Sequence, residues 1–262
     1  MLQLPVRTAL RRLPIIALLA LAAAIACSSG SSTAILPDGE GGVYVALGDS
    51  FAAGDGASDA ATTSYVALVG EALRALYGDE LDVRNLAAGG ATTQSLIDGQ
   101  LPTALDILAT GDVRLVTVTI GGNDLNALGA SEVCQQDPAD PECPIADILT
   151  GIEQRLDSTL VQLRQAASDT PIVMELYPNI FSGTGHLFEQ SAETAFGMLN
   201  DVIEDVTARN GVILADPRGP FAGNGRELTH LLDPTPDPHP NDDGHRAIAR
   251  AFLDSVGLSL GE

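Results

Sequence analysis

The sequence contains no tryptophan, no lysine and only three cysteines among its 262 residues. Without lysine, the chain cannot carry out the Schiff-base or amine-nucleophile chemistry that depends on that side chain. Six phenylalanines and four tyrosines leave few aromatic rings on which a sugar could stack. These absences exclude lysine-based catalysis and weigh against a polysaccharide ligand.

Positive charge is also scarce, because 13 basic residues stand against 35 acidic ones and give a net charge of −22. Such a surface repels nucleic acid and anionic lipid headgroups, so we expect no nucleic-acid partner. No histidine lies near the cysteines, which argues against a metal site there. We expect no metal and no cofactor, and we expect the protein to be a monomer.

Residues 1–26 have the composition of a secretory signal peptide. Arg7, Arg11 and Arg12 precede an uncharged apolar run over residues 13–25. This run is shorter than a typical transmembrane helix and ends in small residues, as secretory signals do. We therefore expect an exported protein.

Cys27 follows Ala24-Ile25-Ala26 and precedes a stretch rich in serine and glycine. This arrangement resembles the lipobox of bacterial lipoproteins, although Ala24 stands where those proteins usually have leucine. Lipidation of Cys27 would hold the protein on a membrane, with residues 27–42 as a flexible tether. The alternative is ordinary signal cleavage, which would release a secreted protein.

The other two cysteines, Cys134 and Cys143, lie close together in a loop rich in Asp, Pro and Gln. In an exported protein such a pair is expected to form a disulfide. Two free, unreactive thiols are the alternative.

From residue 43 onward, short apolar runs alternate with longer amphipathic stretches, which predicts βαβ units around a parallel sheet. The predicted strands are 43–47, 81–86, 113–120, 172–176 and 212–215. The predicted helices are 64–77, 93–110 with an interruption at Pro102, 145–168, 188–210 and 242–256. We predict one α/β domain over residues 43–262, a three-layer α/β/α sandwich with a five-stranded parallel sheet.

Residues that could take part in catalysis follow three of the predicted strands, at the sheet edge where the active sites of such folds form. Ser50 comes after Gly48-Asp49 at the end of the first strand and is a candidate nucleophile. Gly90 follows the second strand and could offer a backbone N–H, since the missing side chain lets a substrate approach. Asn123 follows the third strand and is a neutral donor suited to a developing oxyanion.

Near the C-terminus, Asp237-Pro238-His239-Pro240 offers a candidate base with a carboxylate beside it. Residues before proline are driven into extended conformations, in which side chains two positions apart point the same way. Asp237 could therefore orient His239 while His239 takes a proton from Ser50. The remaining histidines are expected in structural places: His186 in a loop, His245 on a helix surface and His230 in a structural contact.

Together these motifs resemble the GDSL or SGNH hydrolase superfamily, with Ser50, Gly90, Asn123 and His239 on its four defining positions. The resemblance implies a flavodoxin-like SGNH fold and an esterase or lipase that works through an acyl-enzyme. It also implies an oxyanion hole made of the Ser50 and Gly90 N–H groups and the Asn123 side chain. That family usually places its acid three residues before the histidine, where this chain has Pro236. Asp233 and a backbone carbonyl therefore remain alternatives to Asp237.

The leading hypothesis is an exported serine hydrolase of carboxylic esters. Two alternatives remain open, a catalytically inactive binding lipoprotein with the same fold and an acyltransferase. The sequence does not define the acyl or alcohol group of the substrate, although the scarcity of aromatic residues favours acyl or simple esters.

Overall fold

The structure is a computed structural model that describes residues 36–261. The predicted signal peptide over 1–26, Cys27 and the first part of the predicted tether lie outside these residues. Within the described range, no helix is both long enough and apolar enough to cross a membrane.

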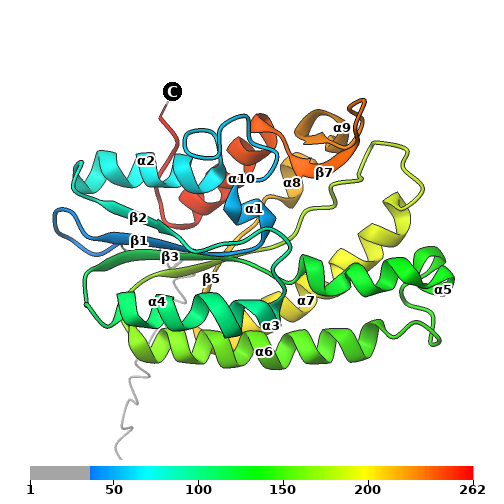
Figure 1. Ribbon diagram of the computed structural model, residues 1–262, viewed down its shortest axis with the longest axis horizontal. Coiled ribbons are helices and arrows are strands. Elements are labelled where there is room, and N and C mark those ends of the chain that lie inside the picture. Colours follow the sequence, from blue (N-terminus) through cyan, green and yellow to red (C-terminus); the bar gives the residue numbers. More distant parts are fainter. Residues whose placement is uncertain (1–35, 262) are drawn as a thin grey trace, which may run out of the picture. The chain divides into compact units, whose positions relative to one another are not determined.

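A parallel sheet of five strands forms the centre of the domain (Figure 1). Its strands are β1 (Val43–Gly48), β2 (Asp82–Asn85), β3 (Val113–Thr119), β4 (Ile172–Glu175) and β5 (Ile213–Ala215). They lie in the order β2-β1-β3-β4-β5, and every neighbouring pair is parallel. β1, β3 and β4 are almost entirely buried, as expected for strands covered on both faces.

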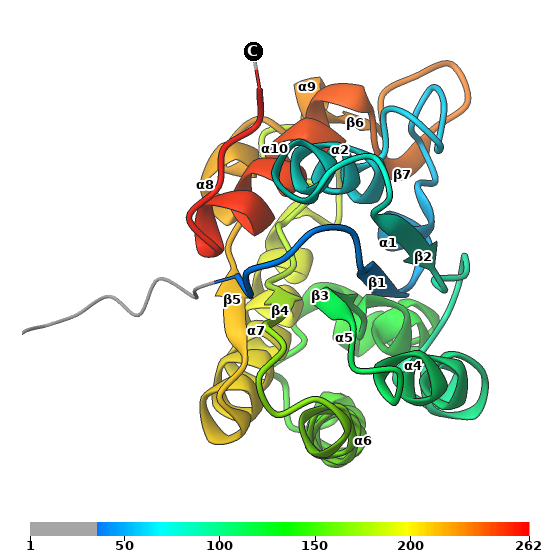
Figure 2. The same ribbon diagram turned by 90° about the vertical axis from the view of Figure 1, so that its left-hand side faces the viewer.

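Helices cover both faces of this sheet (Figures 1 and 2). On one face, α2 (Tyr65–Tyr77) packs against α10 (Asp242–Ser255). On the other face, α6 (Ile145–Ala166) packs against α4 (Leu101–Leu108) and α7 (Glu189–Asn210). The predicted three-layer α/β/α sandwich with a five-stranded parallel sheet is confirmed.

The predicted interruption of the helix over 93–110 takes the form of three short segments. α3 (Thr93–Ser95) passes into a π-helical turn, η1 (Leu96–Gln100), and then into α4. Pro102 lies in the first turn of α4, where the N–H that proline lacks would have no helical partner. Gly211 is the C-cap of α7 and has a φ of +61°, in the left-handed region that glycine tolerates best.

The sequence did not predict a small hairpin formed by β6 (Thr229–His230) and β7 (Asp237–Pro240). These strands pair antiparallel, with His230 opposite Asp237. β7 contains two prolines, which cannot donate ladder hydrogen bonds and so suit a short edge strand. The hairpin gives the segment around His239 a fixed place that a loop would lack.

Short elements complete the fold near the carboxyl ends of the strands. They are α1 (Ser50–Ala53), the 3₁₀ helix η2 (Gly122–Ala130), α5 (Glu132–Gln136), α8 (Arg218–Phe221) and α9 (Gly225–Leu228). Cys134 of α5 and Cys143 form the predicted disulfide, with their Cα atoms 5.1 Å apart. The disulfide closes the loop between α5 and α6.

Residues 37–42, which we assigned to the flexible tether, bind to the folded domain instead. The guanidinium of Arg114 donates hydrogen bonds to the carbonyls of Asp38, Glu40 and Gly41, and the Tyr77 hydroxyl donates to that of Pro37. Arg114 also lies over the Tyr77 ring, 5.1 Å from its centroid. This part of the predicted tether therefore belongs to the domain, because the partly buried side chain of Arg114 binds three of its carbonyls.

Glu175, at the end of β4, is a carboxyl group with no exposed surface. Its Oε2 accepts a hydrogen bond of 2.7 Å from Thr119, whose hydroxyl lies 2.7 Å from that of Tyr65. Its Oε1 has no hydrogen-bond partner in the described residues. Burial raises the pKa of Glu175 to about 8, so the group is mainly protonated at neutral pH.

This buried acid makes the stability of the domain depend on pH. In the unfolded chain Glu175 ionises near its ordinary pKa, whereas the folded protein keeps it protonated up to about pH 8. The contribution of Glu175 to the free energy of unfolding is complete at low pH. It is lost as pH rises, by at most about 1.4 kcal/mol per pH unit. We predict that Glu175→Gln reduces the loss of unfolding free energy between pH 5 and pH 8, measured by urea titration. Glu71→Gln, at an exposed position of α2, should retain the wild-type dependence of unfolding free energy on pH. The same dependence in Glu175→Gln would show that Glu175 is not its cause.

Candidate active site

Ser50 is the first residue of α1, just after β1. Two residues before it, at Gly48, the backbone of β1 lies very close to that of β3. Gly48 has a φ of +149°, and a Cβ added to it would lie 2.3 Å from the carbonyl oxygen of Thr119 in β3. Only glycine fits this position without displacing the backbone. The side chain of Gln100 also fixes Gly48, because it accepts from the Gly48 N–H and donates to the Gly48 carbonyl, each at 2.8 Å.

Asp49 is buried between Gly48 and Ser50 and serves as the N-cap of α1. Its carboxylate accepts a 3.0 Å hydrogen bond from the Phe51 N–H and a short one from the Tyr177 hydroxyl. Burial raises the pKa of Asp49 to about 7, and the hydrogen bond from Tyr177 limits the rise. The Ser50 N–H lies in the first turn of the helix, where N–H groups have no helical acceptor, and it has no hydrogen-bond partner in the described residues.

His239 lies on β7, where Asp237 holds its imidazole. The carboxylate of Asp237 accepts hydrogen bonds from the His239 backbone N–H, at 3.0 Å, and from ring nitrogen Nδ1. Burial raises the pKa of Asp237, but these hydrogen bonds outweigh it and leave the pKa below its ordinary value. Ring nitrogen Nε2 has no hydrogen-bond partner in residues 36–261 and can accept a proton.

Asp233, the second candidate acid of the sequence, contacts a different histidine. Its carboxylate lies 2.7 Å from Nδ1 of His230, and Nε2 of His230 lies 2.8 Å from the carbonyl oxygen of Gly56. Both ring nitrogens of His230 therefore face acceptors, and the hydrogen bond with Asp233 is the main reason that the pKa of His230 is raised. His230 and Asp233 form a structural pair that joins the hairpin to the loop after α1.

Asn123, in the first turn of η2, has an oriented side chain with one donor to spare. Its Nδ2 donates to the carbonyl of Ala91 at 3.0 Å, and its Oδ1 accepts from Asn126 at 3.1 Å. An amide nitrogen carries two hydrogens, so one remains for another acceptor. The bond to Ala91 also ties the loop containing Gly90 to Asn123.

A polar cluster next to Asn123 fixes the same two loops. Asp124 accepts from the Thr93 N–H at 2.9 Å and from the Thr93 hydroxyl at 2.6 Å, and it pairs with Arg155 of α6 at 3.1 Å. Arg155 donates to the Thr93 hydroxyl as well, at 2.6 Å. These residues hold the start of α3 against η2. Arg155 and Tyr177 belong to no sequence motif, so neither could be assigned a role from the sequence.

Ser50, Asn123 and His239 all line one cavity of about 200 Å³. Asp49, Phe51, Gly122 and Tyr177 are also part of its wall. The ring of Phe51 lies edge-on to His239, with 6.2 Å between ring centroids. Gly90 does not line this cavity but lies in the wall of a different one, with a φ of +73°. Its N–H has no hydrogen-bond partner in the described residues.

Comparison with known proteins defines the family. The sequence over residues 46–247 matches the GDSL-like lipase/acylhydrolase family. The chain belongs to this family. A comparison with curated proteins found no match.

Several solved structures resemble this GDSL-family domain. A phospholipase A1 from Streptomyces albidoflavus NA297 is 23% identical with a TM-score of 0.62, and the match covers 82% of this chain and 98% of the phospholipase. An extracellular lipase from Streptomyces rimosus is 23% identical with a TM-score of 0.60, again covering 82% and 98%. An acetylxylan esterase from Geobacillus stearothermophilus is 21% identical with a TM-score of 0.58, covering 86% and 98%. At these identities the likeness shows a shared fold.

One prediction about the GDSL-family domain is wrong. We expected His245 on the surface of α10, but its side chain is completely buried. Its Nδ1 accepts from the Tyr65 N–H at 3.3 Å, its Nε2 lies 3.0 Å from the Asp55 carbonyl oxygen, and burial lowers its pKa. His245, Ile248 and Phe252 repeat at helical spacing, so the periodicity of α10 was the signal that placed His245 on the apolar face.

The two candidate acids can be separated by matched substitutions. Only Asp237 contacts His239, so Asp237→Asn should lower kcat by up to roughly 10⁴-fold on an ester substrate, through loss of ring orientation. Asp233→Asn alters a contact of His230 and should leave kcat within about twofold of the wild type, because exposed ion pairs contribute little energy. Steady-state kinetics of both purified variants would reveal the difference. A larger loss in Asp233→Asn would assign the orienting role to Asp233.

Proposed function

We propose that the protein hydrolyses carboxylic esters through an acyl-enzyme formed on Ser50. The observation that carries this proposal is the shared cavity. A hydroxyl at a helix N-terminus, an imidazole held by a carboxylate and a neutral amide donor all face it. Membership of the GDSL-like lipase/acylhydrolase family supports the same reaction class.

In the first half of the reaction, Ser50 Oγ attacks the carbonyl carbon of the ester while Nε2 of His239 takes the hydroxyl proton. The carbonyl oxygen becomes an oxyanion, which accepts hydrogen bonds from the Ser50 N–H and the spare Nδ2 hydrogen of Asn123. The Gly90 N–H is the third proposed donor: Gly90 does not line this cavity, but it precedes Ala91, whose carbonyl accepts from Asn123. When the intermediate collapses, the C–O bond to the alcohol breaks and His239 returns the proton to the departing alkoxide. The acyl group remains on Ser50.

In the second half, water attacks the acyl-enzyme and gives a proton to His239. A second oxyanion forms in the same donor group, and its collapse breaks the bond to Ser50 Oγ, which recovers the proton. The net reaction converts an ester and water into an acid and an alcohol. Asp237 remains ionised throughout and stabilises the imidazolium, in keeping with its lowered pKa.

Substitution of the nucleophile tests this proposal. Ser50→Ala should lower kcat for p-nitrophenyl acetate by roughly 10⁶-fold, and the remaining activity would be that which needs no nucleophile. Ser168→Ala, at an exposed position after α6, is the matched control and should keep the parental rate. Hydrolysis by Ser50→Ala at the parental rate would refute the proposal.

We further propose that residues 1–26 export the protein and that Cys27 is lipidated. The disulfide between Cys134 and Cys143 supports an extracytoplasmic location, since such bonds persist in oxidising compartments. In a bacterial host, we predict that the full-length protein fractionates with membranes and that Cys27→Ser moves it to the soluble exported fraction. A wild-type protein found only in the soluble fraction would instead indicate ordinary signal cleavage.

A further inference from the structure

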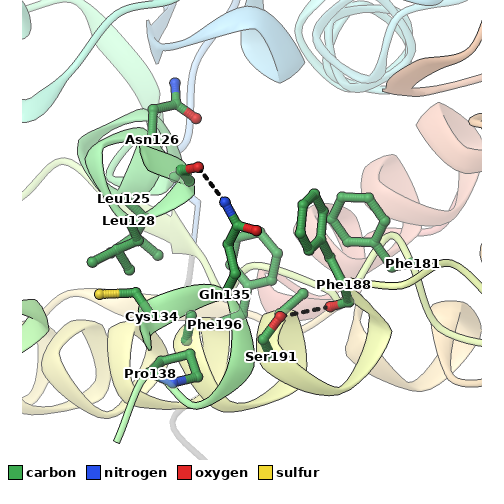
Figure 3. Close-up of a pocket in the computed structure, with 14 residues that line it drawn as sticks. Leu125, Asn126, Leu128, Cys134, Gln135, Pro138, Phe181, Phe188, Ser191 and Phe196 are labelled. Atoms are coloured by element: carbon green, nitrogen blue, oxygen red, sulfur yellow. Dashed lines mark hydrogen bonds between the residues drawn. The ribbon is translucent and has the colours of Figure 1, made fainter. Parts of the chain in front are cut away.

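A second cavity, of about 250 Å³, lies between η2, α5 and α7. In Figure 3, Leu128, Cys134 and Pro138 form one end of it, and Phe181 and Phe188 form the other. Phe196 of α7 lies between the two ends. No charged side chain is among the residues that line it, although the chain as a whole is strongly acidic.

Of the three polar side chains in this wall, Gln135 and Ser191 bond to backbone carbonyls and Asn126 donates to the side chain of Asn123. Gln135 donates to the carbonyl of Gly129 at 2.6 Å, and Ser191 donates to that of Phe188 at 3.3 Å (Figure 3). These bonds occupy the Ser191 hydroxyl hydrogen and one of the two amide hydrogens of Gln135, which leaves fewer donors for a sugar. The wall therefore offers mainly aliphatic and aromatic contacts to a ligand, which suits a hydrocarbon group.

The apolar cavity adjoins the cavity that Ser50 lines. Gly122, Asn126, Phe181 and Phe196 line both. Gly122 and Asn126 flank Asn123, the amide donor. A substrate with its carbonyl at Ser50 can thus extend a chain past Phe181 and Phe196 into the apolar cavity.

The disulfide fixes the far wall of the apolar cavity. Cys134 lines it and is bonded to Cys143, and both side chains are buried. The bond closes a loop of few residues and so restricts the movement of α5, which carries Cys134 and Gln135. The disulfide therefore holds the residues at this end of the cavity in place.

We infer that this cavity binds the acyl chain of the substrate and that the disulfide-held wall sets the preferred chain length. The inference rests on the proposed ester hydrolysis. A volume of about 250 Å³ accommodates roughly eight groups of the size of a water molecule, each with a share of about 30 Å³. A straight acyl chain of medium length fills it, whereas an acetyl group leaves it empty.

Kinetics with p-nitrophenyl esters test the inference. Each methylene transferred from water into an apolar site improves binding by up to about fourfold. The ratio of kcat/KM for the octanoate to that for the acetate should therefore be well above one, with a decline for acyl chains much longer than the cavity. A ratio at or below one would overturn the inference, while acetate hydrolysis that depends on Ser50 would leave the proposed function intact.

Filling the cavity provides the variant test. Ala195 of α7 is buried in the cavity wall, and Ala195→Leu should lower the octanoate-to-acetate ratio at least tenfold. Ala208→Leu, on the exposed side of the same helix, is the matched control and should keep the wild-type ratio. An unchanged ratio in Ala195→Leu would overturn the inference. If that variant does not fold, as judged by circular dichroism, the double variant Cys134→Ser/Cys143→Ser replaces it. It should weaken the decline in kcat/KM for acyl chains longer than the cavity, and an unchanged decline would overturn the inference.

A binding measurement separates this inference from the proposed function. Titration of methyl octanoate and methyl acetate into the Ser50→Ala protein requires no catalysis. The octanoate should bind at least tenfold more tightly, and the added substitution Ala195→Leu should remove that difference. Equal affinities would overturn the acyl-chain assignment whether or not the wild type hydrolyses esters. Preferential octanoate binding without wild-type hydrolysis would instead refute the proposed function alone.

Discussion

The candidate active site depends on the close contact between Gly48 at the end of β1 and the carbonyl of Thr119 in β3. A Cβ at Gly48 would lie 2.3 Å from that oxygen, and the Asp49 N–H donates to the same carbonyl at 2.9 Å. This contact makes the chain turn sharply out of the sheet, so that α1 begins at Ser50. The position of the hydroxyl is thus determined by backbone atoms, which move less readily than side chains.

Parallel strands bring the other groups to the same edge, because their carboxyl ends all lie on one side of the sheet. Asn123 follows β3 and Tyr177 follows β4, and the β6–β7 hairpin adds His239. Each group is then fixed by a partner from another segment: Asn123 by Ala91 and Asn126, and His239 by Asp237. Such preorganisation allows donors to stabilise developing charge without rearranging during the reaction.

The sheet and its main helices could be predicted from the sequence, because long apolar runs and helical periodicity determine them locally. β1, β3 and α7 were predicted to within a residue or two of their ends. The β6–β7 hairpin could not be predicted, since its two-residue strand has no pattern. Long-range partners were also missed, as for Arg155 with Asp124, because sequence shows no contact between residues 31 positions apart. The choice between Asp237 and Asp233 likewise needed the geometry of both histidines.

The proposed reaction requires a hydroxyl, an imidazole and an amide from distant parts of the chain to act on one substrate carbonyl. A crystal structure of the protein after reaction with an alkyl fluorophosphonate would reveal this arrangement, because the phosphoryl oxygen occupies the place of the oxyanion. We expect phosphorus bonded to Ser50 Oγ, His239 Nε2 within hydrogen-bond reach of the adduct, and the phosphoryl oxygen bound by Asn123 Nδ2 and the N–H groups of Ser50 and Gly90. An adduct on another residue, or a phosphoryl oxygen directed away from Asn123, would contradict the proposed reaction.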